Sequence, residues 1–346
     1  MIKKLKYIRL IVSLLLIVPL SLGAIFAYQW IPDSSPHANE MQLALSNLRP
    51  NSDQEFILIK KANGNLMTSS FWFGKESLIK KVAIDSVRFS GTSPIIYWES
   101  GSMEGTNIEY KDLAYPSVVK ENIVDNTYYL GTDKYGRDFL SRLILGARVS
   151  LMAGFFAVII SLLVGLVLGL IAGFFGSWID KTIMWFINVL WSVPTLLLAI
   201  AITLSLGKGL WQVFLAIGLS MWVEIARLVR GRVMQEREQE YVRALKSLGF
   251  SDFRILFKHV LPNIFQPVIV LCAANFATAI LLESGLSFLG IGAAAPTPTW
   301  GNMIRDHYAY IVLDKAYLAI YPGLGIMILV VAFMLLGNYL KDKWAY

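Results

Sequence analysis

Residues 236–263 read EREQEYVRALKSLGFSDFRILFKHVLPN, and their spacing decides how the rest of the chain is interpreted. In the first half, apolar residues recur at i, i+3, i+4 and i+7, which predicts one apolar face of a helix. These residues are Tyr241, Ala244, Leu245 and Leu248. Gly249 follows where a helix end favours a residue that accepts a left-handed backbone. The second half repeats the spacing at Phe253, Leu256, Phe257 and Val260. Pro262 is expected to end this second helix.

The stretch therefore predicts two short amphipathic helices around a glycine hinge, and basic residues surround them. The 230–262 segment contains Arg230, Arg232, Arg237, Arg243, Lys246, Arg254 and Lys258. One interpretation is a basic loop whose apolar face rests on a membrane surface. The other is a docking element that moves as a unit, with its apolar residues set into a groove on a partner. Spacing alone leaves both open.

The composition of the whole chain indicates a membrane protein. Of 346 residues, 56% are hydrophobic and 16% are charged. In soluble domains about 45–50% of the residues are apolar and about 25% are charged. The net charge of +7 would suit nucleic acid if basic residues gathered on a soluble surface, but many of them flank apolar runs. We therefore expect a lipid environment and no nucleic-acid partner. Cys272 is the one cysteine, so no disulfide within the chain and no zinc spacing is expected.

Six apolar runs are long enough to cross a bilayer as helices, the first of them preceded by lysines and an arginine. The runs lie at about 10–28, 149–175, 182–206, 211–229, 264–284 and 317–338. A cleaved signal peptide is the alternative for the first run, but that run is longer than a signal core and no clean cleavage site follows it. Six spans place both termini on one side, and the basic N-terminus, central loop and C-terminus identify that side as cytoplasmic.

The segment at 30–140 has a different pattern and is expected to lie outside the membrane. Residues 55–60 (EFILIK) read as a strand that enters an Asn63-Gly64 hairpin turn. Further short strands are expected at 87–89, 95–98 and 107–110. The fold class is thus an all-α membrane protein of six transmembrane helices, with a small β-rich extracytoplasmic domain between the first and second. Its parts are 1–29, 30–140, a core at 141–338 with the loop at 236–262, and a cytoplasmic tail at 339–346.

Several residues within the predicted spans have a structural and a functional interpretation. Gly165, Gly169 and Gly173 recur every four residues, a spacing that lets two helices approach closely, within the chain or against a partner; a substrate-lining face is the alternative. Pro194 interrupts the third run as a kink or as a hinge. Glu224 is expected to pair with an arginine of its own helix, Arg227 or Arg230. Glu283 is either a gate or interface residue or a solvated helix end.

No catalytic or metal-binding group is predicted. Asp133 and Asp138 lie near one another in sequence without a base, a nucleophile or a metal-ligand spacing, and the three histidines are scattered. His259 is expected to pack or cap within the 236–262 loop. No phosphate-binding Gly-Lys motif is present, so ATP must be bound by another chain. A membrane enzyme would need polar residues that converge within the spans, and the sequence predicts no such set. A channel or secondary transporter would show inverted repeats or midplane charges, and the sequence indicates neither.

The 236–263 stretch resembles the coupling loop of binding-protein-dependent ABC importer permeases. In that family an E-A-A-x-x-x-G segment is followed, after a nine-residue interval, by I-x-L-P. Ala244 and Gly249 match the first segment, and His259-Val260-Leu261-Pro262 corresponds to the second. Arg243 and Leu245 depart from the pattern. The peptide-permease branch of the family shows a version that Glu240-Tyr241-Val242 and His259–Asn263 fit closely.

Two other segments resemble the same branch. One is LGTDKYGRDFLSR at 130–142 with Gly146-Ala147-Arg148, and the other comprises Glu283, LSFLG at 286–290 and PTWG at 298–301. The resemblance covers about 128–340 and implies the ABC transmembrane type-1 domain. The insert at 30–127 is not typical of the branch.

The resemblance implies a permease subunit in the bacterial cytoplasmic (inner) membrane that forms half of a pathway for peptides. The implied partners are a second permease, two cytoplasmic ATPases and an extracytoplasmic substrate-binding protein, besides membrane lipid. No cofactor is implied for this chain, since ATP and magnesium belong to the ATPases. The implied ATPase-coupling residues are Glu240, Tyr241, Arg243, Ala244, Leu245, Leu248, Gly249, His259 and Pro262. The alternatives are an importer of nickel or another chelated solute, an exporter, and a self-contained channel or secondary transporter.

Overall fold

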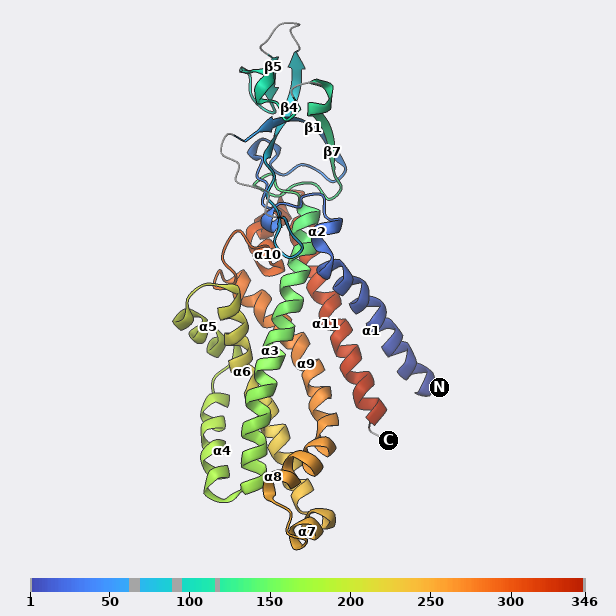
Figure 1. The fold of residues 1–346 in the computed structure, drawn as a ribbon, viewed down its shortest axis with the longest axis vertical. Coiled ribbons are helices and arrows are strands. Elements are labelled where there is room, and N and C mark those ends of the chain that lie inside the picture. The colour runs from blue at the N-terminus through green and yellow to red at the C-terminus, as the bar shows by residue number, and fades with distance from the viewer. Residues whose placement is uncertain (1, 62–68, 89–94, 116–118, 345–346) are drawn as a thin grey trace.

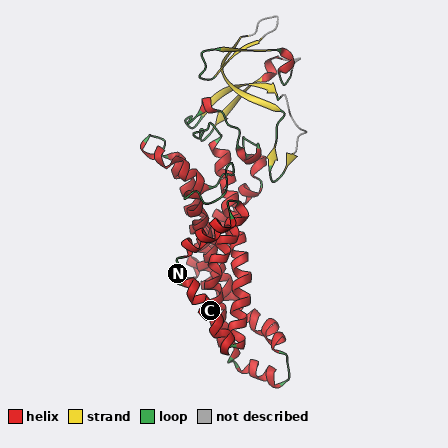
Figure 2. Ribbon diagram, turned by 90° about the vertical axis from the view of Figure 1, so that its left-hand side faces the viewer, coloured by secondary structure: helices red, strands yellow, loops and turns green. Residues whose placement is uncertain are grey.

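The computed structural model describes residues 2–61, 69–88, 95–115 and 119–344. A bundle of long helices carries a β-sheet at one end, and a pair of short helices projects from the other end (Figure 1; Figure 2). The first and last helices lie side by side, and their ends are joined by an ion pair of 2.6 Å between Arg9 and Asp342. The two chain termini therefore lie on the same side of the bundle, away from the sheet.

Five helical stretches are long and apolar enough to cross a membrane, and a bent helix pair raises the number to six if it is one span. The long helices are α1 (Ile2–Ile25), α3 (Phe139–Phe175), α6 (Leu210–Arg237), α9 (Leu261–Phe288) and α11 (Tyr317–Trp344). The short helices are α2 (Ala27–Trp30), α4 (Ser177–Trp191), α5 (Thr195–Leu206), α7 (Glu240–Ser247), α8 (Asp252–Ile255) and α10 (Trp300–His307). Short 3-10 turns lie at Pro36–Ala38, Leu43–Leu45, Tyr110–Asp112, Val119–Asn122 and Tyr308–Val312. A mostly helical membrane protein was predicted, and this is confirmed.

The third predicted span is broken. Instead of one helix over 182–206, α4 and α5 meet at an angle of 92° across Ser192, Val193 and Pro194. Pro194 has an extended backbone (ψ 131°) directly before α5, and proline supplies no backbone N–H to continue a helix. The single continuous helix is therefore wrong, and the break is far larger than an ordinary proline kink.

The helix expected to end at Pro262 does not end there. α8 passes into a π-helical turn at Leu256–Val260 and then into α9, and the stretch Asp252–Phe288 forms one span. Pro262 lies in the first turn of α9, where its missing N–H is tolerated because the backbone changes from π to α hydrogen bonding at that point. α11 likewise continues to Trp344, so most of the 339–346 tail is helical.

The three spaced glycines pack α3 against α6. A Cβ built on Gly165, Gly169 or Gly173 would lie 2.7 Å from a backbone oxygen of α6, those of Trp222, Ala226 and Arg230 respectively. Because both sets advance by four residues, the two backbones remain close over two turns. In the structure these glycines bring α3 close to α6, so their packing partner is a helix of the same chain.

The sheet is antiparallel, with the order β6-β5-β4-β1-β7. Its strands are β1 (Ser52–Lys60), β4 (Ile79–Arg88), β5 (Ile95–Glu99), β6 (Gly105–Ile108) and β7 (Ile123–Tyr128), and β2 (Ser69–Ser70) pairs with β3 (Gly74–Lys75) as a separate ribbon. The Asn63-Gly64 turn lies outside the described residues. Because the partner of β1 begins at Ile79, a two-residue hairpin after residue 60 is wrong. A buried cluster including Ile57, Ile84 and Ile95 forms the core.

A buried ion cluster joins the sheet segment to the helices. Asp133, which is 1% exposed, accepts hydrogen bonds from the Arg137 Nε (2.7 Å) and backbone N–H (3.0 Å), and the Arg142 guanidinium lies 3.7 Å away. Asp138 accepts a hydrogen bond from the Ser141 N–H (2.8 Å) and so caps α3, which begins ten residues before the predicted span. These two carboxylates are therefore structural elements of the junction.

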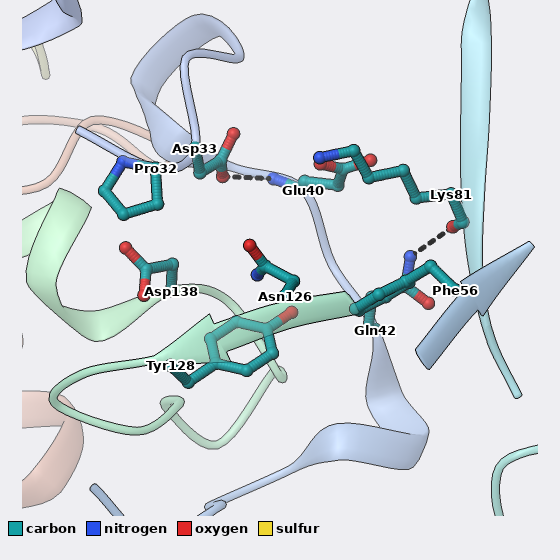
Figure 3. Close-up of a pocket in the computed structure, with 9 residues that line it drawn as sticks. All are labelled: Pro32, Asp33, Glu40, Gln42, Phe56, Lys81, Asn126, Tyr128 and Asp138. Atoms are coloured by element: carbon teal, nitrogen blue, oxygen red, sulfur yellow. Dashed lines mark hydrogen bonds between the residues drawn. The ribbon is translucent and has the colours of Figure 1, made fainter. Parts of the chain in front are cut away.

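A small hollow of about 20 Å³ lies in this junction (Figure 3). Carboxylates of Asp33, Glu40 and Asp138 line it, and the Glu40 backbone N–H donates to Asp33 at 3.2 Å. On the opposite side Gln42 donates to the Lys81 carbonyl at 2.6 Å, which connects the segment before the sheet to β4. Burial raises the pKa of Glu40 and of Asp138.

Candidate coupling surface

The pair α7 and α8 forms the end of the molecule that lies farthest from the sheet (Figure 1; Figure 2). It follows α6 directly and leads directly into α9, so that both long helices end at this pair. We call the exposed part of residues 240–257 the coupling surface. This surface lies within the 236–262 loop that the sequence pattern indicated.

Gly249 ends α7 with a left-handed residue, as predicted, at φ +77°. The Gly249 N–H donates to the Lys246 carbonyl (3.0 Å) and the Phe250 N–H donates to the Leu245 carbonyl (3.1 Å). These two bonds form a Schellman motif, which satisfies carbonyls that the helix end would leave unpaired. No atom lies within 4 Å of a Cβ built at Gly249, so the requirement for glycine is one of backbone conformation and not of space.

The predicted apolar face of α7 divides between the interior and the surface. Val242 is fully buried and packs with Ile255 of α8 in the core, while Tyr241 and Leu245 pack against that core from its edge. Ala244 is exposed, and Leu248 is 74% exposed. Val242 was not singled out by the spacing, because it lies one residue from Tyr241 and its burial depends on α8 folding back beneath α7.

Three polar side chains fix α7 to both long helices. The Tyr241 hydroxyl donates to the Glu236 carboxylate at 2.5 Å, and the Asn263 amide donates to both, at 3.2 Å to Glu236 and 3.1 Å to Tyr241. Glu236 belongs to α6 and Asn263 to α9. Burial and the bond to Glu236 raise the pKa of Tyr241 to about 12, so the phenol remains a donor at neutral pH. The sequence pattern predicted no role for Glu236 or Asn263. The one signal for the hydrogen bond between Tyr241 and Glu236 was the position of an acidic residue five residues before a tyrosine.

The exposed apolar residues continue onto α8 and the π-helical turn after it. Phe253 is 72% exposed and Phe257 45%, with ring centroids 4.4 Å apart. Leu256 and Val260, which share their predicted face, are buried. The coupling surface therefore has an apolar centre formed by Ala244, Leu248, Phe253 and Phe257.

Charged residues surround this apolar centre. Arg243 forms an exposed ion pair with Glu238 at 3.3 Å, and Lys246 lies 3.9 Å from Asp252. Glu240 is exposed at the start of α7. An apolar centre with a charged rim is the composition typical of protein interfaces.

His259 and Pro262 lie behind the coupling surface. His259 is half-buried, and its ring meets Phe250 edge-on at 6.3 Å. Pro262 is exposed at the start of α9. Both residues therefore belong to the connection between α8 and α9.

The coupling surface is also tied to the neighbouring spans. Arg237 donates to the Phe174 carbonyl at the end of α3 (2.9 Å), and the Lys246 ammonium lies over the Phe174 ring, 5.2 Å from its centroid. Arg230 forms a two-point ion pair with Asp180 of α4, one contact of which is 2.6 Å. The expected pairing of Glu224 with Arg230 is therefore wrong. Because α7 contacts α3, α6 and α9 directly, a displacement of α7 can move all three helices.

Glu283 lies near the opposite end of α9 and is 1% exposed. Its carboxylate accepts hydrogen bonds from Ser287 (2.7 Å) and from Ser150 of α3 (3.3 Å). The carboxylate thus joins two spans inside this chain. Among the residues that the structure describes, no three of the types His, Cys, Asp and Glu lie together as a metal site would require.

Comparison with known proteins indicates the family of this chain. The family model of the binding-protein-dependent transport system inner membrane component matches residues 165–345. The dipeptide transport system permease of Alkalihalophilus pseudofirmus is 42% identical over 62% of this chain and 70% of its own. A glutathione transport system permease of Escherichia coli O6:K15:H31 is 40% identical over 62% and 71%. A solved methionine ABC transporter in an inward-facing conformation has a TM-score of 0.49 and 17% identity, over 59% of this chain and 96% of its own.

The chain therefore belongs to the family of binding-protein-dependent transport system inner membrane components. It is a membrane-spanning permease subunit of an ABC importer. It is not an enzyme, because separate ATPase subunits hydrolyse ATP, and its family implies ATPase and substrate-binding partners.

Proposed function

We propose that this chain forms half of a translocation pathway for peptides and is driven by ATPases that dock on the coupling surface. The relatives named for dipeptide and glutathione transport support the substrate class, since both solutes are short peptides. The second permease supplies the other half of the pathway. ATP and magnesium are bound by two ATPases and not by this chain.

The orientation follows from the charges. The ion pair between Arg9 and Asp342 holds both termini together, and the coupling surface lies on their side of the bundle. Because basic loops stay in the cytoplasm, that side is cytoplasmic and the sheet of residues 52–128 lies outside. In this position the sheet is available to a substrate-binding protein.

The observation that carries the docking proposal is the exposed apolar centre on a firmly held helix. Leu248 and Phe253 are each more than 70% exposed, yet α7 is fixed to α6 and α9 through Tyr241. Exposed apolar side chains at the tip of a rigid element are suited to fill a pocket on a partner. A push on α7 is then transmitted to both long helices, which is what coupling to ATP binding requires.

Co-purification from the native membrane tests this proposal. We expect two ATPases, a second permease and this chain to be isolated together. Leu248→Arg and Ala244→Arg place a charge in the apolar centre and should release the ATPases, with transport lost. Val312→Arg is the matched control, because Val312 is 86% exposed at the other end of the molecule, and it should retain them.

Two results would count against the docking surface: isolation of the chain without ATPases, or retention of the ATPases by both charge variants. The substrate class is tested separately. Proteoliposomes with the complete importer and its binding protein should accumulate dipeptides and tripeptides, and uptake of chelated nickel in their place would redirect the assignment.

A further inference from the structure

One carboxylate within the spans has none of the partners expected for it. Glu224 is 14 residues from the start of α6 and 13 from its end, so it lies about 20 Å from either end of that helix. Its side chain is exposed on this chain, and no ion pair or hydrogen bond to it exists within the part of the chain that the structure describes. Arg230 is held by Asp180, and Arg227 lies over the Trp191 ring at 3.7 Å.

Glu224 lies five residues from the inner end of the apolar run at 211–229, and an ionised carboxylate that faces lipid inside a span has a cost that reaches roughly 2.5–3.5 kcal/mol at the span centre. Such residues face a water-filled path or a partner instead. The surroundings of Glu224 fit a path. A hollow of about 30 Å³ beside it has a mainly apolar lining that also includes hydroxyl residues from three helices: Ser220 of α6, Thr195 of α5 and Thr278 of α9.

A second, larger cleft lies on the same two helices nearer the coupling surface. It has a volume of about 700 Å³ and lies between α6, α9 and α11. Its polar lining residues are Arg232, Glu236, Asn263, Gln266, Asn338 and Lys341. On α6 the lining positions of the two hollows follow one another every four residues, from Ser220 through Glu224, Leu228 and Arg232 to Glu236. Each step of four residues turns by about 40° around the helix axis, so the lining positions follow a spiral strip along α6.

We infer that the groove between α6 and α9 is this chain's wall of the translocation path, and that Glu224 binds the ammonium group of the passing substrate. The assignment of an ammonium rests on the proposed peptide function, because the free N-terminus is the cation that unblocked peptides share. A carboxylate supplies charge-assisted acceptors for an ammonium, and the hydroxyls of Ser220 and Thr278 supply further acceptors. Residues at the break between α4 and α5, Trp191 and Thr195 among them, form the opposite wall of the hollow beside Glu224.

Cysteine labelling in the assembled importer tests the path. Cys272 is the one cysteine of the chain, so Cys272→Ser gives a background without thiols in this subunit. Thr278→Cys then places a thiol in the hollow beside the intact Glu224, and Leu163→Cys, 61% exposed on α3 and in neither hollow, is the control. In nanodiscs, charged methanethiosulfonate ethylsulfonate should label position 278 at least about tenfold faster than position 163, because it reacts with hydrated thiolates.

Ligand protection then tests the carboxylate. Millimolar trialanine, added without the binding protein, should slow labelling of Thr278→Cys about tenfold, while N-acetyl-trialanine should not. Glu224→Gln should abolish the protection and Glu224→Asp should retain part of it. Size-exclusion chromatography of the complex shows whether each variant assembles.

Three outcomes would overturn the inference: no labelling of position 278 above the control, equal protection by both peptides, or protection that survives Glu224→Gln. The first would mean that the partner permease or lipid covers the groove. These results are distinguishable from failure of the peptide function, because the difference between positions 278 and 163 does not depend on the substrate. Peptide uptake by the complete importer tests that function independently.

Discussion

At the scale of single residues, the coupling surface depends on backbone conformation at one position and on a polar triangle at another. Gly249 has a positive φ with open space around it, so a side chain there meets no atom and still strains the backbone. Tyr241, Glu236 and Asn263 hold α7 in place by three hydrogen bonds, one between each pair of these side chains. The two features act together, because the Schellman motif sets the direction in which the chain leaves α7.

Gly249→Val should therefore loosen α7 without a steric clash. A left-handed conformation costs a β-branched residue about 1–2 kcal/mol, whereas asparagine tolerates it better. We expect faster amide hydrogen exchange over 240–250 in Gly249→Val, with weaker ATPase retention, and nearly native behaviour in Gly249→Asn. Identical exchange in both variants would show that the hinge does not need the left-handed backbone.

At the scale of elements, the contact between α3 and α6 is the most extensive one between long helices. Three glycines allow α3 to lie against the carbonyl oxygens of α6, and Cβ atoms there would be within 2.7 Å of them. The ion pair between Arg230 and Asp180 and the bond from Arg237 to Phe174 add contacts at the end near the coupling surface. These two helices are therefore expected to move as one body when α7 is displaced.

Gly169→Val should separate α3 from α6 and destabilise the chain by about 1–3 kcal/mol or more, because overpacking forces backbone shifts. Gly231→Ala is the matched control. It changes a glycine of α6 with nothing within 4 Å, and alanine is the better helix former by about 1 kcal/mol. Thermal unfolding of the purified chain in detergent should give a lower midpoint for the first and an equal or higher one for the second. A native midpoint for Gly169→Val would contradict the close packing.

At the scale of the whole molecule, a buried charge cluster joins the sheet segment to the spans. Asp133 is nearly inaccessible and is neutralised by Arg137, with Arg142 close by. A second contact joins α3 to the connection between β2 and β3. Here the Arg148 guanidinium is 4.3 Å from the Trp72 ring centroid and donates to the Trp72 carbonyl at 3.0 Å. Through these contacts the segment that follows the sheet and the β2–β3 ribbon are held against α3.

Arg137→Met should disrupt this junction. Removal of one partner leaves a buried carboxylate uncompensated, which costs about 3–5 kcal/mol, although Arg142 offsets a part of it. Limited proteolysis should release the sheet segment more readily in Arg137→Met than in the wild-type chain, and Asp133→Asn added to it should restore part of the resistance. Lys111→Met, at an exposed ion pair with Glu109, is the control and should change nothing measurable.

The sequence by itself determined what depends on local pattern. Apolar length predicted the spans, the four-residue glycine spacing predicted close helix packing, and the position of Gly249 predicted a left-handed helix end. Each of these properties arises within a few turns of one chain segment. The motifs around the coupling loop and before α3 were specific enough to indicate the family.

Only the tertiary structure decided which face of each element is covered. Spacing grouped Tyr241, Leu245 and Leu248 on one face, but folding of α8 beneath α7 buried the first two in part and left the third exposed. The 92° break between α4 and α5 and the exposure of Glu224 likewise depend on neighbours distant in sequence. Burial is a property of the surface a residue meets and not of the residue, so local spacing shows that a face exists but not what covers it.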